Sequence, residues 1–220
     1  MKNGSTRRQP APPSPYAQAQ RHLARRHGVW KELIRRVGPC TLAPDRDCFR
    51  VLVRSIIAQQ ISTAAAKSIS ARLWDLVAPA KLTPARLASL TDEQLRACGL
   101  STAKRRFLRA LAEHASARGF LRRLSRSTDE EVAAKLLPIP GIGKWTVEMF
   151  LIFGLGRLDV LPVGDLGLRA GAQTWFGLKD LPTPAELTEL AEPWRPYRTV
   201  ATWYLWRSRG FVPQSGMESG

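Results

Sequence analysis

The sequence predicts an all-α fold with about ten short helices. From Tyr16 onward, apolar residues recur at the three- and four-residue spacing that marks one buried face of a helix. Residues that start and stop helices separate these periodic stretches. No segment shows the strict alternation of apolar and polar residues that is typical of a half-buried strand.

The first periodic stretches follow a different kind of segment. Residues 1–15 are rich in Pro, Ser, Arg and Gln, so we predict a disordered basic tail there. Asp47 can cap a helix, and a second helix should run over residues 64–77. The predicted apolar stripes are Phe49, Leu52, Val53, Ile56 and Ile57 in the first of these helices, and Ile69, Leu73, Trp74 and Leu76 in the second. Residues 212–220 are predicted to be a flexible C-terminus.

Further along the chain, local signals mark where helices begin and end. Thr83-Pro84 places a cap before a first-turn proline. The capping-box spacing occurs at residues 91–94, 127–130 and 183–186. Glycines are expected to stop helices at Gly99, Gly119 and Gly210.

The charge balance points to a polyanionic partner. The chain has 34 Lys and Arg against 18 Asp and Glu, a formal net charge of +16. Nucleic acid is the first candidate and an anionic membrane surface the second. No apolar run approaches the roughly 20 residues that span a bilayer, which disfavours a membrane. The three cysteines have no metal or disulfide spacing, which predicts a reduced, intracellular protein without an iron–sulfur cluster.

Residues 127–154 predict a hairpin of two helices. A helix over 127–137 runs into Pro-Ile-Pro-Gly-Ile-Gly, and a second helix over 144–153 follows. Two glycines separated by one residue allow a tight turn and a close approach to a ligand. The free N–H groups and positive dipole end of the second helix suit a phosphate, and Lys144 adds a cation. The alternative is an ordinary turn between helices, in which the glycines only stop the first helix.

The string LPIPGIGKWTVEMF at residues 137–150 resembles the DNA glycosylase superfamily named for its helix-hairpin-helix and its Gly-Pro-Asp signature. Residues 159–165 resemble that family's catalytic loop, residues 55–62 the helix end with the DNA-wedging residue, and residues 196–207 its last helix. The resemblance extends from about residue 47 to 210 and is strongest to the bacterial 3-methyladenine DNA glycosylase II type, here in a short form.

The resemblance implies a helix-hairpin-helix glycosylase fold over residues 16–211, with two helical lobes flanking a DNA-binding and active-site cleft. One lobe would cover 48–157 and the other 16–47 plus 158–211. The implied activity is hydrolysis of the N-glycosidic bond of alkylated purines, of the 3-methyladenine and 7-methylguanine type. The base would be flipped out of double-stranded DNA and an abasic site left.

The resemblance also assigns residues that hold DNA. Backbone N–H groups of Gly141, Gly143 and Thr146 would bind a phosphate beside Lys144, and Gln60 would fill the gap left by the flipped base. Backbone carbonyls of Leu137, Ile139 and Ile142 would hold a structural monovalent cation, and no other cofactor is expected.

Asp165 is the candidate catalytic residue. Cleaving an N-glycosidic bond builds positive charge on the sugar, which a nearby carboxylate stabilises. Asp165 precedes an apolar-periodic segment, so it should cap a helix; the alternative is that capping is its whole role. Many members of the resembling family have a second acid just before this Asp, whereas this chain has Gly164, so the resemblance does not extend to a pair of adjacent acids. Glu148 is the rival carboxylate, with a supporting or structural role.

The resemblance further predicts a monofunctional enzyme. Bifunctional members place a nucleophilic Lys where this chain has Trp145, so water should be the nucleophile. Trp145, Trp206, Gln59 and Met149 are the expected residues of the base pocket. Electron-rich ring faces attract a cationic alkylpurine.

Other hypotheses stay open at this point. The same fold could act on uracil, hypoxanthine or a mismatched adenine, or the chain could be a hairpin module that binds DNA without catalysis. A basic adaptor for RNA or membranes is a third. The group Lys104, Arg105, Arg106 and Arg109 favours contact with the DNA backbone over a merely solvated helix face. We expect a monomer without membrane association, cytoplasmic and nucleoid-associated in a bacterium.

Overall fold

The computed structural model describes residues 15–210, and the described part of the chain is all-α, as predicted. The tail predicted for residues 1–15 lies outside it except for Pro15, where the first helix begins, and residues 212–220 lie outside it altogether. Within 15–210 there are more helices than the ten expected: α1 (Pro15–Arg26), α2 (Gly28–Val37), α3 (Cys48–Ala58), α4 (Thr63–Val77), α5 (Pro84–Ser89), α6 (Asp92–Ala97), α7 (Thr102–Ala115), α8 (Phe120–Leu124), α9 (Asp129–Leu136), α10 (Lys144–Phe153), α11 (Leu166–Phe176), α12 (Pro184–Leu190), the 3-10 helix η1 (Glu192–Trp194) and α13 (Arg198–Ser208).

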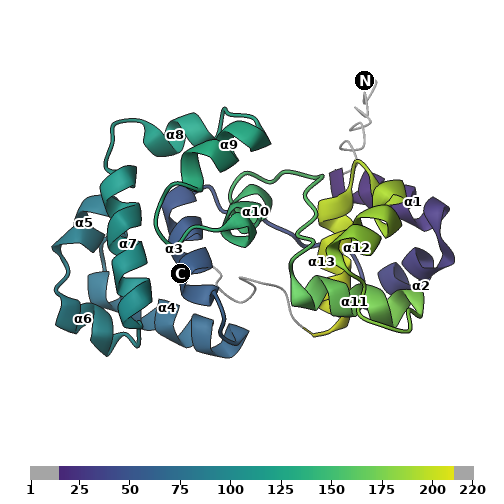
Figure 1. The fold of residues 1–220 in the computed structure, drawn as a ribbon, viewed down its shortest axis with the longest axis horizontal. Helices are drawn as coiled ribbons and strands as arrows, with labels where there is room; N and C mark the ends of the chain where they lie inside the picture. The colour runs from purple at the N-terminus through teal and green to yellow at the C-terminus, as the bar shows by residue number, and fades with distance from the viewer. Residues whose placement is uncertain (1–14, 211–220) are drawn as a thin grey trace, which may run out of the picture.

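The helices form two groups along the long axis of the molecule (Figure 1). One lobe contains α3 to α10, with α10 and α7 packed on α3. The other contains α1, α2, α11, α12 and α13, with α13 packed on α11 and α2. The described part of the chain therefore starts in the lobe of α1 and α2, builds the α3–α10 lobe and returns to the lobe of α1 and α2. In the described part of the chain every helix is too short or too polar to cross a bilayer.

Most of the predicted helix starts are confirmed. Asp47 caps α3, Thr83 caps α5, and capping boxes occur at Thr91 and Thr183. The box expected over 127–130 lies one residue later, where Thr128 and Glu131 bond reciprocally. Ser127 is buried and accepts a hydrogen bond from Lys135 Nζ at 2.6 Å, so this side chain serves the packing of α9.

Three smaller predictions are corrected. Leu76 is 38% exposed, and Val77 provides the buried side chain at the end of α4. Gly119 has a left-handed φ of +72° but lies directly before α8, so it starts that helix and does not end α7. The first helix of the hairpin ends at Leu136, one residue earlier than expected. Gly99 and Gly210 follow α6 and α13 with positive φ, as predicted for helix stops.

Two crossing segments join the lobes, and they contact each other. The Asp45 amide donates to the carbonyl of Phe153 at 2.7 Å. A Cβ on Gly156, whose φ is +65°, would lie 2.9 Å from Pro44, so only glycine fits there. The return segment then continues to Asp165, and its path fixes where that carboxylate lies.

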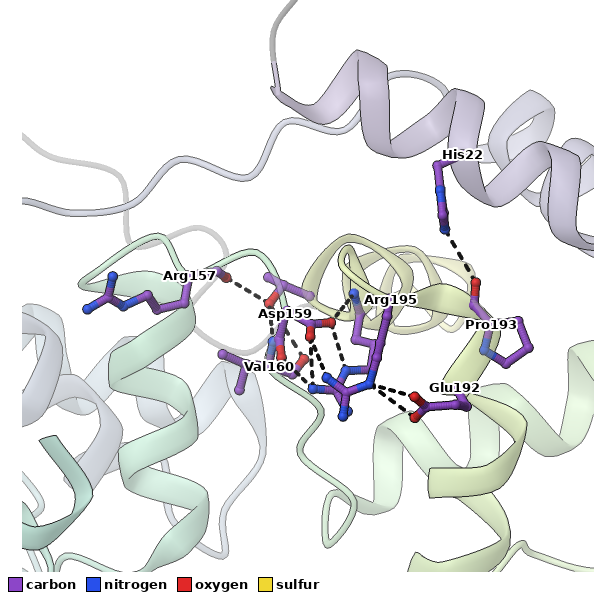
Figure 2. A network of polar contacts seen from close by, with 9 residues as sticks. His22, Arg157, Asp159, Val160, Glu192, Pro193 and Arg195 are labelled. Carbon is purple, nitrogen blue, oxygen red and sulfur yellow. Dashed lines mark hydrogen bonds and ion pairs between the residues drawn. The ribbon is translucent and has the colours of Figure 1, made fainter. Parts of the chain in front are cut away.

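The return segment is tied to the start of α13 by charge and hydrogen bonds. Asp159 faces Arg195, whose Nη1 lies 2.8 Å from a carboxylate oxygen (Figure 2). Arg198 binds the same carboxylate through Nε and Nη2, at 2.7 and 3.0 Å. The Thr199 hydroxyl accepts from the Val160 amide and donates to the Arg157 carbonyl. This network fixes the return segment at Asp159, which lies six residues before Asp165.

Candidate active site and DNA-binding hairpin

A cavity of about 810 Å³ lies where the two lobes meet. Its walls come from the end of α3, the start of α4, the turn before α10 together with the start of that helix, and the start of α11. The lining residues are Ala58, Gln59, Gln60, Ile61, Thr63, Ala66, Gly141, Ile142, Gly143, Lys144, Trp145, Thr146, Gly164, Asp165, Leu166 and Gly167. Residues far apart in the sequence, which the sequence analysis had selected separately, thus share one cavity.

Asp165 is the carboxylate of this cavity, and three N–H groups hold it. It caps α11, with Oδ1 accepting from the Leu168 amide at 2.7 Å and from Trp206 Nε1 at 2.9 Å. Oδ2 accepts from Trp145 Nε1 at 2.8 Å. The residue is only 8% exposed. Three donors fix the orientation of the carboxylate and suit its negative charge.

The four expected pocket residues divide into two pairs. Trp145 and Gln59 line the cavity. Trp206 and Met149 are corrections, because both are 0% exposed and neither lines it. The Trp206 ring stacks on Phe153 at 6.0 Å between centroids, and Trp206 Nε1 donates to the Asp165 carboxylate at the site. Met149 lies in the part of α10 that is buried on all sides. A residue's position in the sequence does not show whether its side chain lines the cavity or lies buried behind the cavity wall.

Gln59 and Gln60 follow α3 and differ in role. Gln59 Nε2 donates to the Gly141 carbonyl and to the Thr146 hydroxyl, both at 2.8 Å, so its amide ties the end of α3 to the hairpin. Gln60 is exposed and has a φ of +55°, the only positive φ at a non-glycine residue within 15–210. Such a backbone costs roughly 1–2 kcal/mol. With this backbone conformation, the Gln60 side chain lies exposed at the rim of the cavity.

The two hairpin glycines are needed for different reasons. Gly141 has a φ of +85°, and a Cβ there would collide with the ring of Phe107. Gly143 has nothing within 4 Å of the position of a Cβ and caps α10 without a side-chain bond. The open space beside Gly143 and the uncapped helix start form a site of the type that binds phosphate. Phe107 was missed by the sequence analysis, because no local signal connects it with the hairpin.

The hairpin carbonyls can be tested as cation ligands. Among the hydrogen bonds of the described residues, the carbonyls of Leu137 and Ile142 accept none, whereas Ile139 accepts from the Ile142 amide at 3.0 Å. No cluster of His, Cys, Asp and Glu in the described part of the chain could hold a metal ion. Neutral carbonyl oxygens suit a hard monovalent cation, so these residues fit the expected group.

Glu148 is a second carboxyl close to the site. It lies one turn after Lys144 in α10, with 4.0 Å between Nζ and Oε1. Burial raises the pKa of Glu148 to about 7, with Lys144 lowering this pKa and the negative charge of Asp165 raising it. Glu148 is absent from the cavity wall.

Comparisons with known proteins agree with this geometry. The family model of the HhH-GPD superfamily base excision DNA repair proteins matches residues 53–196. The chain is 34% identical over 200 residues to the alkylbase DNA glycosidase-like protein mag2 of Schizosaccharomyces pombe, covering 88% of this chain and 94% of that protein.

Two solved structures are also similar. The S. pombe 3-methyladenine DNA glycosylase Mag1, in complex with abasic DNA, has a TM-score of 0.80 and 33% identity, covering 90% of this chain and 99% of that one. The DNA-3-methyladenine glycosidase of Bacillus halodurans has a TM-score of 0.73 and 38% identity, covering 90% of each chain.

Proposed function

The chain belongs to the HhH-GPD superfamily of base excision DNA repair proteins, and from that premise we propose that it excises alkylated purines, of the 3-methyladenine and 7-methylguanine type, from double-stranded DNA. The similar proteins are named for 3-methyladenine or for alkylated bases, which supports this substrate class. The observation that carries the proposal is the Asp165 carboxylate, held by three N–H donors in the wall of a cavity beside the hairpin.

Asp165 acts by stabilising charge. When the glycosidic C–N bond breaks, the bonding electrons leave with the base and positive charge develops on the sugar. A fixed carboxylate lowers the free energy of that state. A water molecule then adds to the sugar carbon and loses its proton, which leaves an abasic site. An alkylated purine that begins as a cation leaves as a neutral base, so the reaction requires no general acid.

We infer a monofunctional enzyme from the side chains at the start of α10. Trp145 takes the place where bifunctional relatives have a lysine, and it lines the cavity with its Nε1 committed to Asp165. Lys144 is largely exposed and lies near Glu148. No imine between a lysine and the sugar is therefore expected.

DNA would be held on the side of the cavity formed by the hairpin. The N–H groups at the start of α10 and the space beside Gly143 would receive a backbone phosphate, with Lys144 beside them. The carbonyls of Leu137, Ile139 and Ile142 would hold a monovalent cation, which would add positive charge to the hairpin. Gln60 would fill the space of the flipped base. That the protein is a monomer, and that it works in the cytoplasm of a bacterium, stay predictions.

The test uses duplexes with single defined lesions and the variant Asp165→Asn. The wild type should release N3- and N7-methylpurines, with strand breakage only after alkali and no adduct trapped by borohydride. Asp165→Asn should release none while still binding lesion DNA. The exposed Asp180→Asn is the matched control and should excise as the wild type does.

Each outcome of this test separates one hypothesis from another. Excision by Asp165→Asn at the wild-type rate would overturn the role of Asp165. Release of uracil or hypoxanthine in place of methylpurines would assign the site to another lesion. Duplex binding without release of any base would leave a DNA-binding module, and a borohydride adduct would identify a lysine nucleophile.

A further inference from the structure

Four basic side chains, Lys104, Arg105, Arg106 and Arg109, lie within residues 104–109 of α7, and three of them are engaged within the protein. Lys104 donates from Nζ to the Ile57 carbonyl near the end of α3. Arg105 bonds to Asp92 and to the Leu100 carbonyl, and Arg109 donates to the Leu90 carbonyl. These three residues hold neighbouring helices in place. Their charges are therefore explained by the fold.

Arg106 differs from its three neighbours. It is exposed, and among the hydrogen bonds and ion pairs of the described residues none involves its side chain. The guanidinium carbon lies 5.6 Å from the centroid of the Phe107 ring. An aromatic face restrains a guanidinium, so Arg106 loses less conformational entropy when it binds an anion.

Phe107 places this arginine at the hairpin. Its ring covers Gly141 at the position where any other residue would have its Cβ. Gly141 lies in the cavity wall with Gly143 and Lys144. Arg106 is therefore separated from the hairpin by one aromatic ring. A basic residue on a different helix thus flanks the turn that the uncapped start of α10 makes suitable for phosphate.

We propose that Arg106 binds a backbone phosphate of the duplex, next to the phosphate held at the hairpin. This inference rests on the proposed function, because it takes DNA as the ligand. The contact lies on the DNA backbone, so it should be independent of the base and of the lesion. It makes α7 a second DNA-contacting element, with a single residue of its basic group facing DNA.

Equilibrium binding to an undamaged duplex, measured over a range of salt concentrations, tests the proposal. Loss of one phosphate contact should reduce the slope of log affinity against log salt by about 0.9. At 0.1 M salt, affinity of Arg106→Ala should fall by roughly 5- to 10-fold. Arg106→Lys should retain the slope, because the charge is kept. Arg86→Ala removes an exposed arginine from α5 and should leave the slope unchanged.

The outcomes separate this inference from the proposed function. If the wild type binds duplex with a steep salt slope and Arg106→Ala shows the same slope, the assignment of Arg106 is wrong while DNA binding stands. Equal reductions in Arg106→Ala and Arg86→Ala would show a general field effect and would also overturn it. A wild type that does not bind duplex would contradict the proposed function itself. The melting temperature of Arg106→Ala should stay close to that of the wild type, because within the described residues the side chain has no hydrogen bond or ion pair and its exposed cation–π contact with Phe107 contributes only about 0.5–1 kcal/mol.

Discussion

At the scale of single residues, Trp206 holds the Asp165 carboxylate, to which we assign the catalytic role in the proposed function. Its ring is fully buried on Phe153, and its Nε1 is one of two indole donors to Asp165. Trp206→Phe would keep an aromatic ring but remove the donor to Oδ1. A hydrogen bond to a charged group contributes about 1.5–3 kcal/mol. We expect the single-turnover excision rate to fall by roughly 10- to 100-fold, with DNA affinity nearly unchanged.

The matched control for this variant is in the same helix. Trp203 is buried, and its ring packs against Tyr204. Trp203→Phe should lower stability slightly but leave excision at the wild-type rate. If both variants lose activity in proportion to their loss of stability, the bond from Trp206 to Asp165 has no separate importance.

The raised pKa of Glu148 predicts that the stability of the protein depends on pH. Its pKa is raised from 4.5 to about 7 in the folded protein. Between these values the folded state binds a proton that the unfolded state does not, so the contribution of Glu148 to stability falls as pH rises through this window. The loss is at most about 3 kcal/mol above pH 7. Glu148→Gln removes the ionisation and should escape this loss.

Urea unfolding at pH 5 and pH 8 measures the effect. The free energy of unfolding of Glu148→Gln, relative to wild type, should increase by roughly 1–3 kcal/mol between the two pH values. The exposed Glu189→Gln in α12 should keep the same difference from wild type at both. An equally constant difference for Glu148→Gln would show that the Glu148 carboxyl ionises as freely as in the unfolded chain.

At the scale of elements, Gln59 couples the end of α3 to the hairpin. Its amide donates to the Gly141 carbonyl and the Thr146 hydroxyl. Gln59→Leu would leave both acceptors without this donor, and we expect a loss of roughly 1–3 kcal/mol in stability. Because the hairpin is no longer held, affinity for damaged and undamaged duplexes should fall together. Chemical unfolding and duplex binding measure the two effects.

The neighbouring Gln60 supplies the comparison. Its side chain is exposed on the rim, so Gln60→Ala should leave stability within about 0.5 kcal/mol of the wild type. It should instead reduce excision if Gln60 fills the gap left by the flipped base, as proposed. Full stability and duplex affinity in Gln59→Leu would show that the link is dispensable.

Local signals in the sequence predicted many of the helix bounds and many residues of the candidate site. The glycine turn, the bounds of α10 and the caps at Asp47 and Asp165 follow from residues close in the sequence, which is why they could be identified. Contacts between residues that are far apart in the sequence could not be identified in this way. The packing of Phe107 on Gly141 and the binding of Asp159 by Arg198 depend on how helices are placed in space. The same limit explains why Trp206 and Met149 were taken for pocket residues.

At the scale of the whole molecule, the cavity depends on how the lobes are joined. The α3 end and the hairpin belong to one lobe, whereas Asp165 starts α11 in the other. The return segment between them is anchored at Asp159 (Figure 2). On the side of the α3–α10 lobe, Arg157 forms an ion pair with Asp129 and donates from Nη2 to the Ser127 carbonyl. Loosening these anchors should move the carboxylate relative to the hairpin.

Asp159→Asn tests this joint between the lobes. The amide keeps one acceptor for Arg198, whose side chain is only 14% exposed, but removes the charge that also binds Arg195. We expect a loss of roughly 1.5–3 kcal/mol in the free energy of unfolding. Single-turnover excision should slow more than duplex affinity falls, because the hairpin is intact while Asp165 is less well placed. Asp92→Asn breaks a similar ion pair with Arg105 within the α3–α10 lobe. Because Asp92 is 55% exposed, this variant should cost at most about 1 kcal/mol and leave excision unchanged. Equal effects of the two variants on excision would show that the Asp159 network stabilises the fold without positioning the carboxylate.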